Sequence, residues 1–211
     1  MNVIALPANR RSTSQRRRTP QIIEAVARVF AERGFHGATT QDIADVLGIK
    51  QASLYYYFSS KEAALELVCQ KGVEGFFDAA KAIAARPESA RKRLTLLIHS
   101  HLSPLIDRPD FVKVFLNERH HLPRESRRRI GRWSRGLERI FEGVIREGIA
   151  KREFRPDLDA RLATLAILGM CNATSNWHRK ENVDVARVAA EFAHLVIDGM
   201  GRGPAPVRRR R

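Results

Sequence analysis

The chain has 211 residues, which is enough for one large domain or two smaller ones with a substantial hydrophobic core. Its hydrophobic content is 44%, and no apolar run is long enough to cross a bilayer, so a soluble protein without a membrane partner is expected. The formal net charge of +15 favours an anionic partner such as nucleic acid.

The positive charge is concentrated at the two ends of the chain. Residues 1–18 and 202–211 each carry five arginines and no acidic residue, so these ends hold +10 of the +15. We expect residues 1–18 to form a flexible basic arm whose Arg16, Arg17 and Arg18 contact DNA phosphates. The glycines and prolines of residues 202–211 predict a basic disordered tail that aids solubility.

The two cysteines indicate a reducing compartment. Cys69 and Cys171 each lie within a helical apolar pattern, where a buried free thiol is the expected state. The segment MNVIALPANRR is too short in its apolar part for a signal peptide. A cytoplasmic location, with the protein acting on DNA, is therefore expected.

The first helix is expected to begin at Thr19 and Pro20. Threonine is a good N-cap, and proline suits the first helical position because its missing N–H costs nothing there. Gly34 is expected to end this helix. The apolar positions between them recur at helical spacing and are Ile22, Ile23, Val26 and Phe30.

The stretch from Thr39 to Lys61 is expected to form two short helices with a tight turn between them. Thr40 is expected to cap the first helix, Gly48 to supply the positive φ of the turn, and residues 51–58 to form the second helix. Ser60 is expected to cap the next helix. The residues expected to face inward are Ile43, Ala44, Leu47, Ile49, Leu54 and Tyr55. Such a pair of helices builds a poor core but presents one helix well to a DNA groove, which predicts a helix-turn-helix.

The side chains of this stretch suit DNA recognition. Gln51 and Gln41 carry amides that match base edges, typically adenine. Small side chains at Ala52 and Ser53 let the helix backbone approach DNA closely. Side chains that reach phosphates follow them, namely Tyr56, Tyr57 and Lys61. For each polar residue the alternative is a solvated surface position, and for the tyrosines it is core packing.

Residues 18–68 resemble the DNA-binding domain of the tetracycline-repressor (TetR/AcrR) family of bacterial regulators. The matching positions form a long run without gaps: Ile22, Ile23, Phe30, Gly34, Thr39, Thr40, Asp42, Ile43, Ala44, Gly48, residues 53–58, Ser60, Lys61 and Glu62. The resemblance implies a DNA-binding repressor with contacts from Thr40, Gln41, Gln51, Ala52, Ser53, Tyr55, Tyr57 and Lys61.

The chain departs from the family pattern at two positions. Lys50 stands where the family has a small capping residue, so the reading helix loses a cap and gains a charge. Val26 replaces an alanine of the first helix, which changes packing only. The full set of expected DNA contacts is Thr39, Thr40, Gln41, Lys50, Gln51, Ala52, Ser53, Tyr55, Tyr56, Tyr57 and Lys61, together with the arginines of the arm.

The remainder of the chain continues the helical pattern, and no strand pattern of note appears. We therefore expect an all-α protein of about nine helices, with a helix-turn-helix domain at residues 19–65 and a larger helical domain at residues 66–201. The further expected helices run from Ser60 to Arg86, from 88 to about 106, after Pro109, from 123 to about 150, from 157 to 177 and from 182 to about 200.

The long helix after Pro123 carries a stripe of arginines along one side. Their spacing of three or four residues puts them on one helical face. A solvated face is the expected explanation, and an anionic ligand or a partner subunit is the alternative. The members are Arg124, Arg128, Arg132, Arg135 and Arg139.

The last two helices are rich in small and apolar residues, which suits a two-fold helical bundle between subunits. A homodimer is also what a palindromic operator requires, and the resemblance implies a dimer formed here. The expected interface residues are Leu162, Ala166, Gly169, Ala173, Val185, Val188, Phe192, Leu195 and Val196.

The larger domain is expected to bind a small hydrophobic effector. A mostly apolar pocket with a few polar groups is the usual ligand site. The candidate lining residues are Phe76, His101, Phe111, Phe115, Glu118, Trp133, Asn172 and Trp177. The end of the chain, from the EFRPDLD segment onward, is similar to family members that respond to acyl-CoA thioesters, which implies an acyl-CoA or another lipid metabolite.

An enzyme and a nucleoid protein are the two alternatives to a regulator. A metal-dependent enzyme would need ligands such as His120 and His121, but adjacent histidines and the pair His99 and His101 do not share a helical face, and no catalytic motif appears. No enzyme activity, metal or cofactor is therefore expected. A nucleoid protein that binds any DNA through its basic ends is the other alternative.

Overall fold

The computed structural model describes the backbone of residues 13–201 and the side chains from residue 18 onward. These residues form helices and no strand, which confirms the predicted all-α class. The helices in chain order are α1 (Thr13–Gly37), α2 (Thr40–Leu47), α3 (Gln51–Leu54), α4 (Lys61–Val73), α5 (Phe76–Ala84), α6 (Ala90–Leu102), α7 (Pro104–Asp107), α8 (Pro109–Glu118), the 3-10 turn η1 (Arg119–His121), α9 (Arg124–Ala150), α10 (Ala160–Trp177) and α11 (Val185–Met200).

All nine predicted helical segments are present, but two of them are broken. The helix predicted from Ser60 to Arg86 divides into α4 and α5, because Gly75 takes a left-handed φ of 83° that interrupts the helical backbone. The segment predicted from 88 to 106 divides into α6 and α7, where Pro104 lacks the N–H that would continue the first helix.

Helix α1 begins at Thr13, so the prediction that it starts at Thr19 is wrong. Pro20 lies inside the helix, because its fixed φ is helical and its missing N–H removes only one backbone hydrogen bond. Residues 13–18 of the predicted flexible arm are therefore helical, whereas residues 1–12 and the predicted tail at 202–211 lie outside the described residues. Gly34 interrupts the helix with φ 70° and ψ 167°, and one more turn follows.

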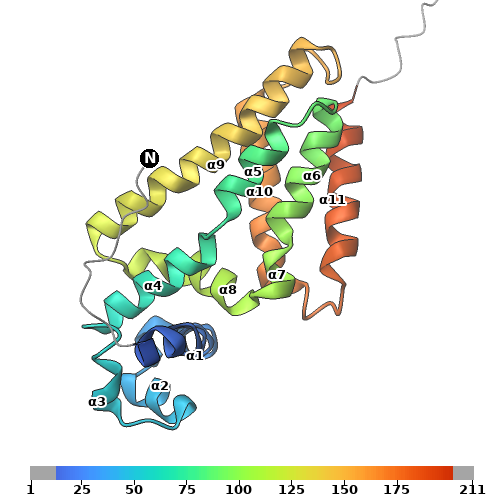
Figure 1. Cartoon of the computed structure of the whole chain (residues 1–211). Coiled ribbons are helices and arrows are strands. Elements are labelled where there is room, and N and C mark those ends of the chain that lie inside the picture. The colour runs from blue at the N-terminus through green and yellow to red at the C-terminus, as the bar shows by residue number, and fades with distance from the viewer. Residues whose placement is uncertain (1–12, 202–211) are drawn as a thin grey trace, which may run out of the picture.

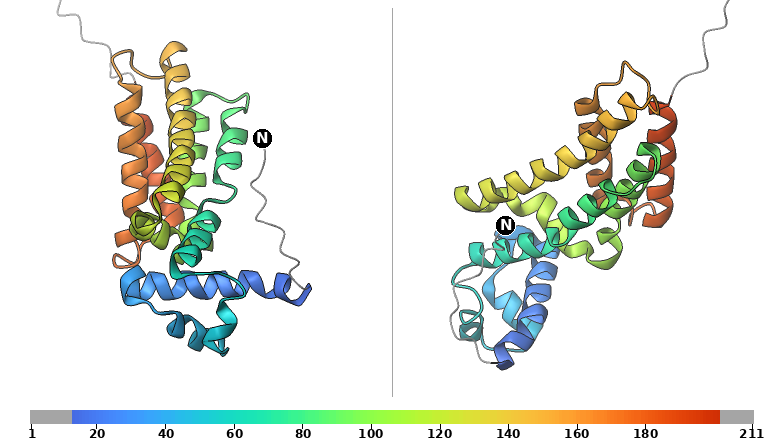
Figure 2. Two further views of the ribbon diagram at one scale, coloured as in Figure 1. Left: turned by 90° about the vertical axis from the view of Figure 1, so that its left-hand side faces the viewer. Right: turned by 45° about the horizontal axis from the view of Figure 1, so that its top comes forward.

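The buried side chains form two separate hydrophobic cores. The first core lies under α1–α4 and includes Phe30, Ile43, Leu54 and Leu65. The second core joins α5, α6, α9, α10 and α11. Figure 1 shows α1–α3 gathered at one end of the molecule and α6, α10 and α11 side by side at the other. In the left view of Figure 2, α1 lies crosswise to the upright helices of the second core.

The first core is completed by residues from the larger predicted domain. Val114 of α8 is fully buried in it, with Leu122 and Ile130 beside it. Helix α8 packs against both α1 and α4. The approach to α4 is close, because a Cβ on Gly72 would lie 3.2 Å from the carbonyl oxygen of Phe111. The predicted domain boundary at residue 65 therefore does not separate the two cores.

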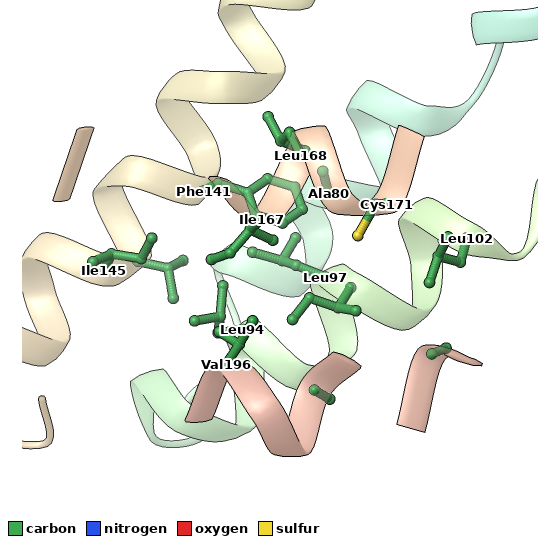
Figure 3. Packing of buried hydrophobic residues seen from close by; sticks show 14 of the residues in the cluster. Ala80, Leu94, Leu97, Leu102, Phe141, Ile145, Ile167, Leu168, Cys171 and Val196 are labelled. Atoms are coloured by element: carbon green, nitrogen blue, oxygen red, sulfur yellow. The ribbon is translucent and has the colours of Figure 1, made fainter. Parts of the chain in front are cut away.

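The second core packs aliphatic side chains around the buried ring of Phe141. Figure 3 shows Leu94 and Leu97 of α6 beside Phe141 and Ile145 of α9, with Ile167 from α10 closing the group. All five are buried. Burying such side chains contributes roughly 1.5–3 kcal/mol each, so this core dominates the stability of the larger part.

Both cysteines are buried free thiols, as predicted. Cys69 belongs to the first core and Cys171 to the second. Burial raises the pKa of each thiol to about 12, which keeps both protonated near neutral pH. They therefore act as small hydrophobic residues.

Within residues 13–201, none of the helices combines the length and the apolarity that crossing a bilayer requires.

Two glycines of α9 offer a matched test of the packing. A Cβ on Gly148 would overlap the buried ring of Phe154 and lie 3.0 Å from Cβ of Ala90, whereas Gly143 faces open space. We expect Gly148→Ala to destabilise the protein by about 1–3 kcal/mol through overpacking. Gly143→Ala should instead stabilise it by up to about 1 kcal/mol through helix propensity. Urea denaturation at one protomer concentration measures both, and equal effects would contradict the packing around Phe154.

Candidate functional site

The helix-turn-helix is held together by a capping box at the start of α2. The backbone N–H of Thr39 donates to the Asp42 carboxylate over 2.8 Å, and the N–H of Asp42 donates to the Thr39 hydroxyl over 3.1 Å. The prediction that Thr40 caps this helix is therefore wrong by one residue, because Asp42 stands three positions after Thr39 and completes the reciprocal pair. Hydrogen bonds from Thr39 and the charge of Arg33 lower the pKa of Asp42.

The turn and the reading helix have the expected start but not the expected length. Gly48 takes the left-handed conformation at φ 63°, and Lys50 stands at the N-cap of α3 without a side-chain capping bond. The helix ends at Leu54 rather than Phe58, and residues 55–57 form a turn. After Leu54 the backbone forms hydrogen bonds to the third residue before, from Tyr56 to Ser53 and from Tyr57 to Leu54, so the chain tightens into a turn.

The tyrosines divide differently from the prediction. Tyr55 was expected to anchor the helix, but its side chain is exposed to 56%, and Tyr56 to 72%. Tyr57 packs against the first core instead. The turn after Leu54 rotates these side chains away from helical spacing, which moves the inward position from Tyr55 to Tyr57.

The two glutamines of the predicted surface are exposed, and each has a partner within the chain. Nε2 of Gln51 donates to the Thr40 hydroxyl over 2.6 Å and so joins α3 to α2. Nε2 of Gln41 donates to Asp45 over 2.6 Å. Their orientation is therefore held before any DNA arrives. The other predicted contacts on this surface are exposed or half-exposed: Thr39, Thr40, Lys50, Ala52 and Ser53.

Lys61 has a structural partner that the sequence did not reveal. Its ammonium donates to the carbonyl of Ala38 over 2.7 Å and lies 4.6 Å from the ring centroid of Phe35. Lys61 therefore links the start of α4 to the end of α1. Arg18 is exposed on α1, and the side chains of Arg16 and Arg17 lie outside the described ones.

The junction between the end of α1 and the α8–η1 segment is polar as well as apolar. Glu118 at the end of α8 accepts a hydrogen bond from the N–H of Phe35 over 3.0 Å. The ring of His121 stacks on the ring of Phe35, with the two centroids 5.2 Å apart. Nδ1 of His121 lies 3.1 Å from Nε2 of His36. Glu118, predicted to line the effector pocket, is therefore a junction residue.

A small apolar cavity lies where both cores meet. Its volume is about 50 Å³, and its lining contains no charged side chain. Five of the eight residues predicted for the effector pocket line it: Phe76, His101, Phe115, Trp133 and Asn172. The others include Phe111, which packs on the first core, and Trp177, which packs near Phe192 in the second. The cavity also takes Gly72 and Cys171, which the sequence pattern did not single out for it.

The walls of the cavity connect to the end of α4 through Arg108. The guanidinium of Arg108 donates to the carbonyls of Lys71 over 3.0 Å and Glu74 over 3.1 Å, which are among the last of α4. It also lies 5.7 Å from the ring centroid of Phe76, which lines the cavity. Arg108 therefore connects a ring of the cavity wall to the C-terminal end of α4.

A basic groove of about 350 Å³ lies beside this cavity along α9. Arg119, Arg127 and Arg135 line it, with Glu138 as its acidic member. Arg119 connects the two sites, since its guanidinium lies 5.0 Å from the ring centroid of Phe115.

The predicted arginine stripe lies mostly outside this groove. Its five members are exposed, and none forms an ion pair with another described residue. Of these five arginines Arg135 lines the groove and the other four are exposed outside it, so the solvated face stays a prediction.

The predicted dimer residues fall into two groups. Five are exposed and form an apolar or small face on α10 and α11: Leu162, Ala166, Gly169, Ala173 and Leu195. Leu165, which the prediction omitted, is exposed beside them. The prediction is wrong for Val185, Val188 and Val196, which are buried in the second core, and Phe192 is half-buried against it. Helical spacing identified the apolar positions but not which subunit covers them.

Comparisons with known families and structures agree with this arrangement. Residues 22–68 match the family described as "Bacterial regulatory proteins, tetR family", and residues 87–200 match "Tetracyclin repressor-like, C-terminal domain". The HTH-type transcriptional repressor KstR2 of Rhodococcus jostii is 28% identical over 92% of this chain and 96% of its own.

Two solved structures are similar over most of the chain. The ketosteroid transcriptional regulator KstR2 of Mycobacterium tuberculosis has a TM-score of 0.82 at 25% identity, covering 88% of this chain and 96% of its own. FadR from Bacillus subtilis in complex with stearoyl-CoA has a TM-score of 0.70 at 27% identity, covering 85% of this chain and 98% of its own.

The junction histidine predicts a pH dependence of stability. Burial, followed by the charges of His120 and His36, lowers the pKa of His121 from 6.5, despite the opposing charge of Glu118. In the unfolded chain His121 takes up a proton near pH 6.5, whereas in the folded protein it remains neutral to lower pH, so its contribution to stability is lost as the pH falls below about 6.5.

We expect His121→Phe, which keeps the stacking on Phe35, to lose less stability than the unchanged protein between pH 7.5 and 5.5. Urea denaturation at both pH values measures this difference. An equal loss in the two proteins would show that His121 does not titrate in this way.

Proposed function

Because the chain belongs to the TetR family of bacterial regulatory proteins, we propose that it is an effector-controlled repressor that binds a palindromic operator as a homodimer. The family consists of transcriptional regulators rather than enzymes, so a metal-dependent enzyme is no longer an alternative. We assign DNA reading to residues 19–65, effector binding and dimerisation to residues 66–201, and the protein to the cytoplasm.

The exposed surface of α2, α3 and the turn that follows is the observation that supports this proposal. Gln51, Tyr55 and Tyr56 are exposed there at one end of the molecule, although large aromatic side chains are usually covered. Tyrosine hydroxyls suit phosphates, and a glutamine amide suits a base edge. Recognition of a DNA major groove accounts for both kinds of exposed side chain on this surface.

The apolar face of α10 and α11 supports the homodimer. Leu162 and Leu195 are exposed to 64% and 65%, and Gly169 and Gly199 face open space. Burying this face against a second copy removes apolar surface from water and allows close helix approach. A two-fold dimer would then present two reading helices to successive major grooves.

We propose an acyl-CoA thioester or a related lipid metabolite as the effector. An apolar cavity next to a groove lined by three arginines suits a molecule with an apolar tail and anionic phosphates. The relatives support this class, since one is a ketosteroid regulator and another is seen with stearoyl-CoA. The cavity of about 50 Å³ is far below the 300–1,000 Å³ typical of ligand pockets, so binding must widen it.

Widening the cavity would act on α4 through the break at Gly75. Phe76 lies between the cavity and Arg108, and Arg108 binds the last carbonyls of α4. Displacement of Phe76 therefore changes the support of α4, whose other end carries Lys61 and the link to α1. In a dimer this shift changes the spacing of the two reading helices, which lowers operator affinity.

The proposal is tested by selecting bound sequences from a random DNA pool with the full-length protein. A palindromic site with two half-sites about one helical turn apart is expected. Stearoyl-CoA should then release the selected DNA, with free CoA and stearate as controls. Weak discrimination between sequences, together with steep salt dependence, would instead support the nucleoid-type alternative.

Two substitutions separate base reading from phosphate contact. Gln51→Ala should lose about 1–3 kcal/mol of preference at one base pair of each half-site, because the amide is the base-reading group. Gln70→Ala, at an exposed glutamine of α4, is the matched control and should change nothing. Lys61→Ala should weaken all sequences and lower the salt slope by about one.

Fluorescence anisotropy on the selected site and on single-base variants measures these effects. Because Lys61 also braces Ala38, the unfolding midpoint of each variant must be recorded. The same binding profile for Gln51→Ala and Lys61→Ala would contradict this division of roles.

A further inference from the structure

One ring nitrogen in the cavity is buried without a hydrogen-bond partner. Nε2 of His101 lies 3.0 Å from Oδ1 of Asn172, but Nδ1 is shielded from solvent and reaches no partner among the described protein atoms. Both residues line the cavity. A buried polar atom left unpaired costs about 1–3 kcal/mol, so such atoms in native proteins call for an explanation.

The hydrogen bond to Asn172 determines what Nδ1 offers. The amide oxygen of Asn172 only accepts, so Nε2 of His101 carries the ring proton. The surroundings keep the ring neutral, because burial lowers the pKa of His101 below 6.5. A neutral imidazole carries one proton, and Nδ1 is therefore a lone-pair acceptor.

The rest of the cavity does not supply a donor to this acceptor. The ring of His101 is flanked by Phe76, with centroids 6.2 Å apart, and by Phe141 at 6.1 Å. The thiol of Cys171 is a weak donor and forms no hydrogen bond to Nδ1. Arg108 and Arg119 lie over the rings of Phe76 and Phe115 and do not line the cavity, so no charged group neutralises an anion inside it.

We propose that the part of the effector held in this cavity is uncharged and donates a hydrogen bond, from a hydroxyl or an amide N–H, to Nδ1 of His101. This inference rests on the proposed role of the cavity as the effector site. His101 is then the residue that determines specificity, and Asn172 positions it by holding the proton on Nε2. A plain hydrocarbon chain such as the stearoyl tail, a ketone and a carboxylate all leave Nδ1 unpaired, so an effector with one of these groups in the cavity binds more weakly than one with a donor.

The first test needs no ligand. Long-range proton–nitrogen NMR spectra of the protein labelled with nitrogen-15 histidine distinguish protonated from unprotonated ring nitrogens. The chain has seven histidines, and comparison with His101→Phe identifies the signals of His101. We expect Nε2 protonated and Nδ1 unprotonated at pH 7.5. A proton on Nδ1 would overturn the proposal.

The second test compares two probes of the same formula. Hexan-1-ol has a hydroxyl donor, whereas dipropyl ether has only an acceptor oxygen. We expect the alcohol to bind about tenfold more tightly by calorimetry, since the ether leaves Nδ1 unpaired. The Nδ1 signal should shift with the alcohol alone. Equal binding of the two probes, or binding of neither, would overturn the proposal.

Matched variants locate the preference. His101→Phe keeps a ring of similar size, and it should bind both probes equally. His99→Phe makes the same change on the same helix outside the cavity, and it should keep the tenfold preference. Loss of the preference in both variants would show that it does not depend on His101.

The operator experiment is independent of these measurements. Failure to select a palindromic DNA site would overturn the proposed repressor while leaving the hydroxyl preference of the cavity intact. Selection of a site without any alcohol preference would overturn only the assignment of His101.

Discussion

The packing of α8 against α1 and α4 is the contact on which the rest of the molecule depends. Helices α1, α2 and α3 cannot bury enough apolar surface by themselves. Val114, Leu122 and Ile130 complete the core that these helices share with α4. The close approach at Gly72 leaves no room for a side chain between α4 and α8. The surface proposed to read DNA is therefore held, through α1 and α4, against α8 of the larger domain. A shift of α8 would change the position of that surface.

The cavity lies where the packing between the two cores leaves open space. Its lining comes from seven helices that belong to both cores, α4 to α10. Cores packed at native density shift between discrete arrangements rather than deforming smoothly. The break at Gly75 and the two hydrogen bonds of Arg108 lie beside this cavity, and the proposed route from effector to α4 runs through them.

The charge of the proposed DNA-reading domain favours recognition through neutral groups. Residues 19–61 carry four basic and four acidic side chains, so they are formally neutral. Arg33 is paired with Asp42, and Lys61 is bonded to a backbone carbonyl. We therefore propose that base preference comes from Gln51 and its neighbours, and that Lys50 and the arginines before Thr19 add sequence-independent attraction to phosphates.

The sequence by itself determined the helical class, the nine helical segments and the helix-turn-helix. Helical spacing, capping residues and the glycine at the turn are local properties, and each is set by residues within a few positions of one another. The same local chemistry identified Ser60 as a cap and Gly48 as the turn, and the structure has both. It also placed five of eight candidates in the cavity, because aromatic and polar residues on inward faces are few.

Only the tertiary structure decided which neighbour each inward residue meets. Spacing marks a face as apolar, but it does not say whether another helix, a second subunit or a ligand covers that face. Val185 and Val188 are therefore core residues although they share an apolar pattern with the exposed Leu195. In the same way, Glu118 and Lys61 bond across distant segments, and no local pattern contains such a partner.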